Sequence, residues 1–157
     1  MTETERIVDQ LQRSLDGPAW HGPSLNEILS DLDPALAAAR PLEGVHTIWE
    51  LLLHVTEWIR IGRRRIDGEL TPEDIPIEQN WPVVEDASPE AWKLALDTLR
   101  TEHNLLISHC SRLTDAELSD IVPGREYTNY FLLHGVVQHN LYHAGQMALL
   151  KSSLLKR

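Results

Sequence analysis

Two histidines four residues apart, His139 and His143, lie in a long apolar-periodic stretch near the C-terminus. In an α-helix this spacing places both imidazoles on the same face, one turn apart, so that both can coordinate one metal ion. Because the chain contains eight histidines, a pair at this spacing is weak evidence by itself. The pair predicts a metal site only if its helix turns it toward the protein interior.

The helical wheel of this stretch places the two histidines on its apolar face, which is expected to be buried. At 100° per residue, His143 and the apolar residues lie within about 80° of His139, on one side of the helix; these residues are Leu132, Val136, Met147, Leu150 and Leu154. Gln146 projects within about 20° of His139. Its amide is therefore predicted to support the site by orienting a ligand histidine or a bound molecule.

A third ligand would have to come from another helix. His54 lies at the margin of an apolar stripe on an earlier helix, and facing helices of a bundle project side chains into a common interior. His54 is thus a plausible third ligand, although a packed or hydrogen-bonded histidine fits the same position. Glu57, one turn further on, could act as a general base or hydrogen-bond a ligand histidine, or simply face solvent.

Two further residues of a third helix lie on its apolar face. His103 is central to that stripe, so its buried imidazole needs a partner, either a metal ion or a carboxylate such as Glu57. Cys110 on the same face is interpreted as a small buried hydrophobe, with a thiolate near a metal as the alternative. We predict no nucleophilic side chain.

The elements that must position these residues follow from periodicity and from Ser, Thr, Pro and Gly signals. Helices are predicted over 2–15, 25–32, 45–67, from Pro89 to about 113, and over 128–154, with a small Ala-rich turn between Pro34 and Pro41. Ser24 and Ser88 are the predicted N-caps of the helices that begin at Leu25 and Pro89. With almost no strand signal, the pattern predicts an all-α fold, an up-and-down four-helix bundle in one domain of residues 1–157. Residues 70–88 hold three prolines and are predicted to form a long connection that covers a pocket as a lid.

Composition limits the partners. The formal charge of -10 disfavours binding to nucleic acid or to anionic membranes. The single cysteine and the lack of a leader or a long apolar run favour a cytoplasmic protein. A run of arginines at 60 and 63–65 is either a solvated helix end or an anion-binding lip.

The chain resembles the DinB/YfiT-like superfamily of metal-binding four-helix bundles. The resemblance rests on Trp49-Glu50-Leu51-Leu52-Leu53-His54 and on His139-x-x-x-His143-x-Gly145-Gln146. It implies that His54, His139 and His143 bind a divalent metal, and that the protein is a cytoplasmic homodimer of the kind common in this largely bacterial family. Where many relatives carry arginine and histidine this chain has Ala144 and Tyr142, which weakens any inference about the substrate but leaves the three histidines unchanged.

Three neutral imidazoles would leave a divalent ion one open position, as in catalytic zinc sites. The superfamily includes transferases and isomerases that use low-molecular-weight thiols, so the resemblance implies a thiol-dependent S-transferase or a hydrolase acting on a small molecule. We favour zinc or nickel over a haemerythrin-like di-iron site, which would need more carboxylates. The alternative function is a non-catalytic dimeric bundle in which the histidine cluster is structural or vestigial.

Overall fold

The computed structural model describes residues 1–155 as an all-helical protein, so the last two residues of the predicted 1–157 domain lie outside the described residues. Its helices are α1 (Glu3–Leu15), α2 (Leu25–Leu29), α3 (Pro34–Ala38), α4 (Ile48–Ile66), α5 (Ile77–Asn80), α6 (Pro89–Cys110), the 3-10 helix η1 (Glu117–Ser119) and α7 (Asn129–Leu155). Apart from two isolated β-bridges, residues 1–155 form no β-structure. The all-α prediction is therefore confirmed.

Side-chain caps decide where the helices begin. Ser24 and Ser88 cap α2 and α6 as the sequence predicts, and Pro89 takes the first helical position. The helix predicted from residue 45 begins three residues later, at Ile48, because the Thr47 hydroxyl and the Glu50 carboxylate form a capping box. Residues 45 and 46 therefore belong to the preceding loop.

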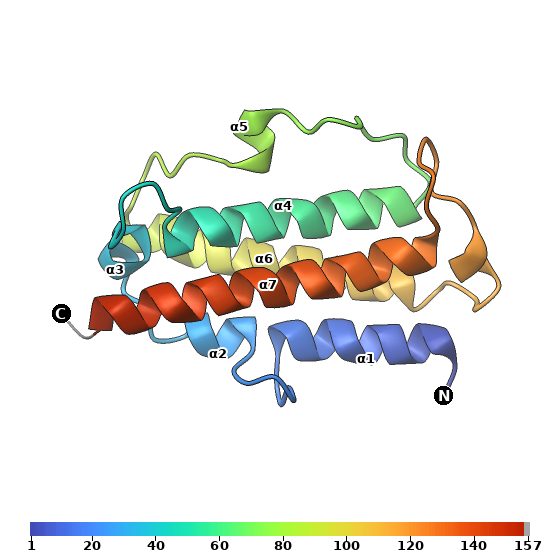
Figure 1. Ribbon diagram of the computed structural model, residues 1–157, viewed down its shortest axis with the longest axis horizontal. Helices are drawn as coiled ribbons and strands as arrows, with labels where there is room; N and C mark the ends of the chain where they lie inside the picture. Colours follow the sequence, from blue (N-terminus) through green and yellow to red (C-terminus); the bar gives the residue numbers. More distant parts are fainter. Residues whose placement is uncertain (156–157) are drawn as a thin grey trace.

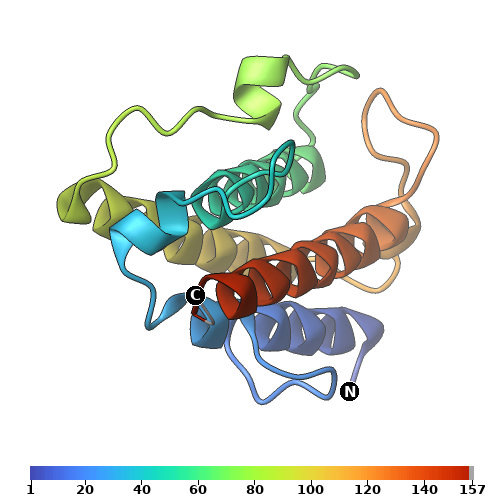
Figure 2. The same ribbon diagram turned by 60° about the vertical axis from the view of Figure 1, so that its left-hand side comes forward.

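Four long helices, α1, α4, α6 and α7, lie side by side (Figures 1 and 2). Helix α4 packs against α6 and α7, and α1 packs against the same two helices. The colours of Figure 1 show that α4 and α6 run in the same direction, while α1 and α7 run the opposite way. Strict up-and-down alternation is thus not confirmed, because residues 67–88 return along the molecule before α6 begins.

The helices enclose one apolar core that includes Leu11, Leu52, Leu99, Leu133 and Met147, each at most 1% exposed. Between α4 and α7 the approach is close, since a Cβ atom at Gly62 would lie 3.0 Å from Cγ2 of Val136. A glycine at this position lets the two helices approach and brings their polar side chains within reach of each other. No helix within residues 1–155 has the length and apolarity needed to cross a membrane.

Candidate metal centre

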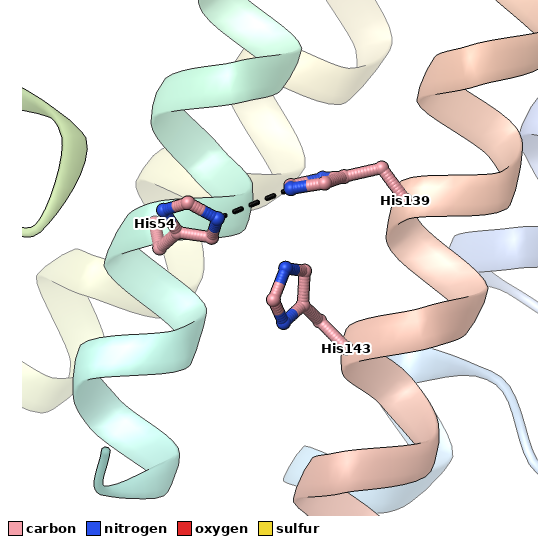
Figure 3. Close-up of side chains that lie close together, drawn as sticks. All are labelled: His54, His139 and His143. Atoms are coloured by element: carbon pink, nitrogen blue, oxygen red, sulfur yellow. Dashed lines mark hydrogen bonds between the residues drawn. The ribbon is translucent and has the colours of Figure 1, made fainter. Parts of the chain in front are cut away.

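Three histidines converge between α4 and α7. His54 projects from α4 and faces His139 and His143, which project from successive turns of α7 (Figure 3). Their candidate ligand atoms all lie within 4.8 Å of one another. The structure thus brings together the three residues that the sequence singles out, and the group could hold a metal ion.

Hydrogen bonds donated by Nδ1 fix the orientation of two of these imidazoles. Nδ1 of His54 donates to the backbone carbonyl oxygen of Asn80 at 2.6 Å, and Nδ1 of His143 donates to Oε1 of Gln146 at 2.6 Å. Both acceptors are oxygens without a hydrogen to give, so the Nδ1 atoms must carry the protons. The Nε2 lone pairs of both rings are consequently free for coordination.

All three imidazoles are held in the neutral form that metal binding requires. Burial lowers the pKa of His54 to about 4 and that of His139 to about 3. Burial also lowers the pKa of His143, an effect that its bond to Gln146 partly opposes. At neutral pH none of the three rings is an imidazolium that would have to lose its charge before a metal binds.

The spacing of the donor atoms agrees with a small divalent ion. Two nitrogens bound at ~2.0 Å to a tetrahedral ion lie ~3.3 Å apart, and Nε2 of His54 lies 3.1 Å from Nε2 of His139. Without a metal, His139 can only satisfy this contact by donating to His54, which leaves its own Nδ1 buried with no partner among residues 1–155. The donor set, the tautomers and the spacing all fit a metal ion.

A pocket of about 700 Å³ opens onto the three histidines. Its walls are mostly apolar and aromatic, with Trp58, Trp81 and Tyr142 prominent. The Trp81 ring stacks between His46 and His54, with centroid distances of 3.6 and 3.8 Å. The pocket has the size and the apolar lining typical of small-molecule sites.

Of the two residues predicted to support the histidines, one contacts them and the other does not. Gln146 contacts His143 directly. Glu57 is buried, not solvent-facing, and its carboxylate accepts hydrogen bonds from Arg60 and from Gln79 of α5, so it has no contact with the histidines. It anchors the connection between α4 and α6.

The structure does not bring His103 to the metal centre. Its ring lies beside Gln12 and Asp16, in a cavity on the α1 side of α6. Burial lowers its pKa to about 4, an effect that the Leu11 backbone and the Asp16 carboxylate partly oppose. Cys110 is fully buried, and burial raises the pKa of its thiol to about 11, as expected of a small buried hydrophobe.

Sequence reasoning missed several residues of the pocket, among them two that contact His54 and a fourth histidine. Asn80 and Trp81 belong to the connection that the sequence predicts to be a lid, and His46 precedes α4. The connection has no apolar periodicity to show which residues face inward. A tryptophan in this acidic, proline-rich stretch is the one signal that could have identified the contact.

Comparison with known proteins identifies a family and a similar fold. The family model of the DinB superfamily matches residues 19–147, which is more than half of the chain and includes all three histidines. No curated protein sequence matches significantly. A conserved protein from Enterococcus faecalis of known crystal structure has a similar fold, with a TM-score of 0.73 over 100% of this chain and 99% of that chain, at 16% sequence identity.

Proposed function

Because the chain belongs to the DinB superfamily, we propose that it is a metal-dependent enzyme, a thiol-dependent S-transferase or a hydrolase that acts on a small molecule. One observation carries the proposal. Three neutral imidazoles converge on the wall of an apolar pocket of about 700 Å³, so an ion that they held would be accessible to a molecule in the pocket. Structural sites are usually closed by a fourth protein ligand.

A divalent ion at this site would supply a nucleophile near neutral pH by favouring the ionised form of a bound water or thiol. The chain itself orients the ligands. The Asn80 carbonyl and the Gln146 amide oxygen hold the Nδ1 protons of His54 and His143. Trp58 and Trp81 pack against the His54 ring and exclude water from it.

His46 is the remaining imidazole of the pocket and is proposed to accept a proton from the reacting group. Its Nδ1 contacts the Glu50 carboxylate at 3.3 Å, which leaves Nε2 as the acceptor. Glu57 does not have this role, because both of its oxygens are occupied by Arg60 and Gln79.

Imidazole ligands and one open position favour zinc or nickel as the resident ion. A low-molecular-weight thiol is the proposed co-substrate, since the apolar walls suit an organic electrophile and a thiolate is a strong ligand for these metals. We further propose a homodimer built on a four-helix bundle, in line with the family resemblance.

Metal content tests the proposal. Protein made without a histidine tag should carry close to one divalent ion per chain by elemental analysis, and His54→Ala, His139→Ala and His143→Ala should each lose it. His134→Ala is the matched control, because His134 lies on the same helix and lines none of the pockets near the site. A metal-free wild type, or variants that retain the ion, would contradict the proposal.

Activity separates catalysis from a structural role. Conjugation of a small electrophile with a low-molecular-weight thiol should be saturable, lost on chelation and restored by zinc or nickel. His46→Gln should lower kcat at neutral pH while leaving the metal content unchanged. Turnover that persists after complete removal of the metal would exclude the enzymatic proposal.

A further inference from the structure

The arginine run at the end of α4 contains one guanidinium without a carboxylate partner. Three of the four arginines form ion pairs: Arg60 with Glu57 and Glu102, Arg63 with Glu102 and Asp67, and Arg64 with Glu69. Arg65 differs, because no carboxylate of residues 1–155 lies within 4.0 Å of it. It is also the most buried of the four, with 5% exposure.

A buried cation is unfavourable unless it is paired, and in this chain of net charge -10 an unpaired one is unusual. The neighbours of Arg65 are neutral or positive. Its Nε donates to Oγ1 of Thr71 at 2.8 Å and its Nη1 donates to the hydroxyl of Tyr127 at 2.9 Å. Arg125 donates to the same Thr71 hydroxyl, so two guanidinium groups share one neutral oxygen.

Burial lowers the pKa of Arg65 from its usual value, and the nearby charge of Arg125 acts in the same direction. An arginine nevertheless stays charged at neutral pH. Its Nη2 has no hydrogen-bond partner within the described residues, and the same is true of the Tyr127 hydroxyl as a donor. The guanidinium also lies over the Trp58 ring, 5.8 Å from its centroid, but no anion neutralises it. Two donors and one positive charge without an anionic partner are therefore available at the same place.

Arg65 and Tyr127 line a cavity of about 230 Å³, separate from the first pocket, whose other walls are mainly apolar, with Phe131 and Val136 among them. The Trp58 ring and His139 line both cavities. A molecule in the second cavity would thus lie against a predicted metal ligand.

We infer that this second cavity binds the anionic group, a carboxylate or a phosphate, of a small apolar molecule, with the Arg65 guanidinium and the Tyr127 hydroxyl as donors. A planar guanidinium fits either anion, often through two parallel hydrogen bonds. The apolar walls accommodate the rest of the molecule. That this molecule is the substrate of the metal centre rests on the proposed function; the anion site itself does not.

Benzoate and benzamide form a matched pair of probes, because they share shape and ring and differ in charge. With ¹⁵N-labelled, fully chelated protein at constant ionic strength, benzoate should shift the indole N–H resonance of Trp58 saturably. Benzamide should bind at least tenfold more weakly. Phenyl phosphate in the same titration shows whether carboxylate or phosphate is preferred.

Two pairs of variants locate the binding. Arg65→Met should weaken benzoate binding at least tenfold, whereas Arg64→Met should stay within twofold of the wild type. Gly135→Leu should block the cavity without touching Arg65, because Gly135 lines it and a Cβ atom there meets nothing within 4 Å. Gly145→Leu is its control on the same helix, since Gly145 is exposed and lines neither cavity.

The inference is overturned if benzoate and benzamide bind equally well, if no saturable shift is seen, or if Gly135→Leu binds benzoate like the wild type. The Gly135 variant decides the question should Arg65→Met fail to fold. Benzoate binding that requires the metal would place the anion on the ion and not on Arg65, leaving the proposed function intact. If the protein binds no metal but binds benzoate as described, this inference stands and the proposed function does not.

Discussion

A hydrogen bond that fixes the proton on Nδ1 of an imidazole leaves Nε2 free to bind a metal. For His143 the decision depends on a single side chain, because its Nδ1 proton is held only by Oε1 of Gln146. His54 depends instead on a backbone carbonyl, which no substitution removes directly. Gln146 is therefore the most informative residue to change outside the three histidines.

Gln146→Leu should lower metal affinity about ten- to a hundredfold, the usual effect of removing a hydrogen bond to a ligand histidine. Competition with a chromophoric chelator measures the change. Gln138→Leu, at an exposed position of the same helix, is the control and should leave the affinity unaltered. Equal affinities for the wild type and Gln146→Leu would show that the contact does not orient His143.

His103 is a buried titratable group outside the metal centre and makes stability depend on pH. Its pKa is about 4 in the folded protein, against 6.5 when exposed, because burial disfavours the imidazolium. The unfolded chain therefore binds the additional proton between pH 6.5 and 4. Stability from this residue is fully present above pH 6.5 and is lost as the pH falls through that window.

His103→Leu should reduce the slope of unfolding free energy against pH between 6.5 and 4 by ~1.4 kcal/mol per pH unit. At pH 7 the variant should stay close to the wild type in stability, because leucine puts an apolar side chain in place of a buried polar ring. Urea unfolding of chelated protein at several pH values measures both effects. If unfolding free energy depended on pH in the same way for both proteins, His103 would not be the source of this pH dependence.

At the scale of elements, the connection between α4 and α6 supports the three-histidine site. Besides the Asn80 carbonyl on His54, the Asn80 side chain accepts a hydrogen bond from the Trp58 indole, and Trp81 stacks on the His54 ring. Glu57 of α4 also accepts a hydrogen bond from the Gln79 side chain of α5. The connection thus covers the site through several independent contacts.

Trp81→Ala should accelerate metal release at least several-fold, since stacking of this kind contributes ~0.5–1.5 kcal/mol and the ring shields His54 from water. The rate is measured by trapping released ion with excess chelator. Trp20→Ala is the control, because Trp20 is fully exposed and lines a different pocket. A release rate unchanged from the wild type would mean that the connection does not protect the site.

At the scale of the whole molecule, a bound ion would join helices that are far apart in the sequence. His54 lies on α4 and the histidine pair lies on α7, and these helices pack closely at Gly62 and Val136. Because the unfolded chain does not hold the three histidines together, metal binding should stabilise the folded state.

Zinc at a hundred times its Kd should add ~2.7 kcal/mol to the unfolding free energy. For a protein of this size that corresponds to a rise in Tm of about 5–10 °C. His139→Ala should show no comparable rise, and magnesium should have little effect on the wild type because it prefers oxygen ligands. An equal response to both metals would indicate general attraction of cations by the acidic surface.

Helices, caps and inward faces are local properties, and the sequence by itself determined them. The starts of α2 and α6 follow from Ser24 and Ser88, and the inward turn of His139 and His143 follows from the spacing of the apolar residues around them. The family resemblance added His54. These predictions succeed because cap chemistry and helical periodicity act over a few residues.

Only the tertiary structure decided which faces meet. A helical wheel places His103 at the centre of an apolar face and His54 at the margin of one, yet packing turns His103 toward α1 and His54 toward α7. The same packing pairs three arginines of one run with carboxylates and leaves Arg65 unpaired. Rotation of one helix against another and the path of an aperiodic connection depend on contacts between distant residues, which no local pattern records.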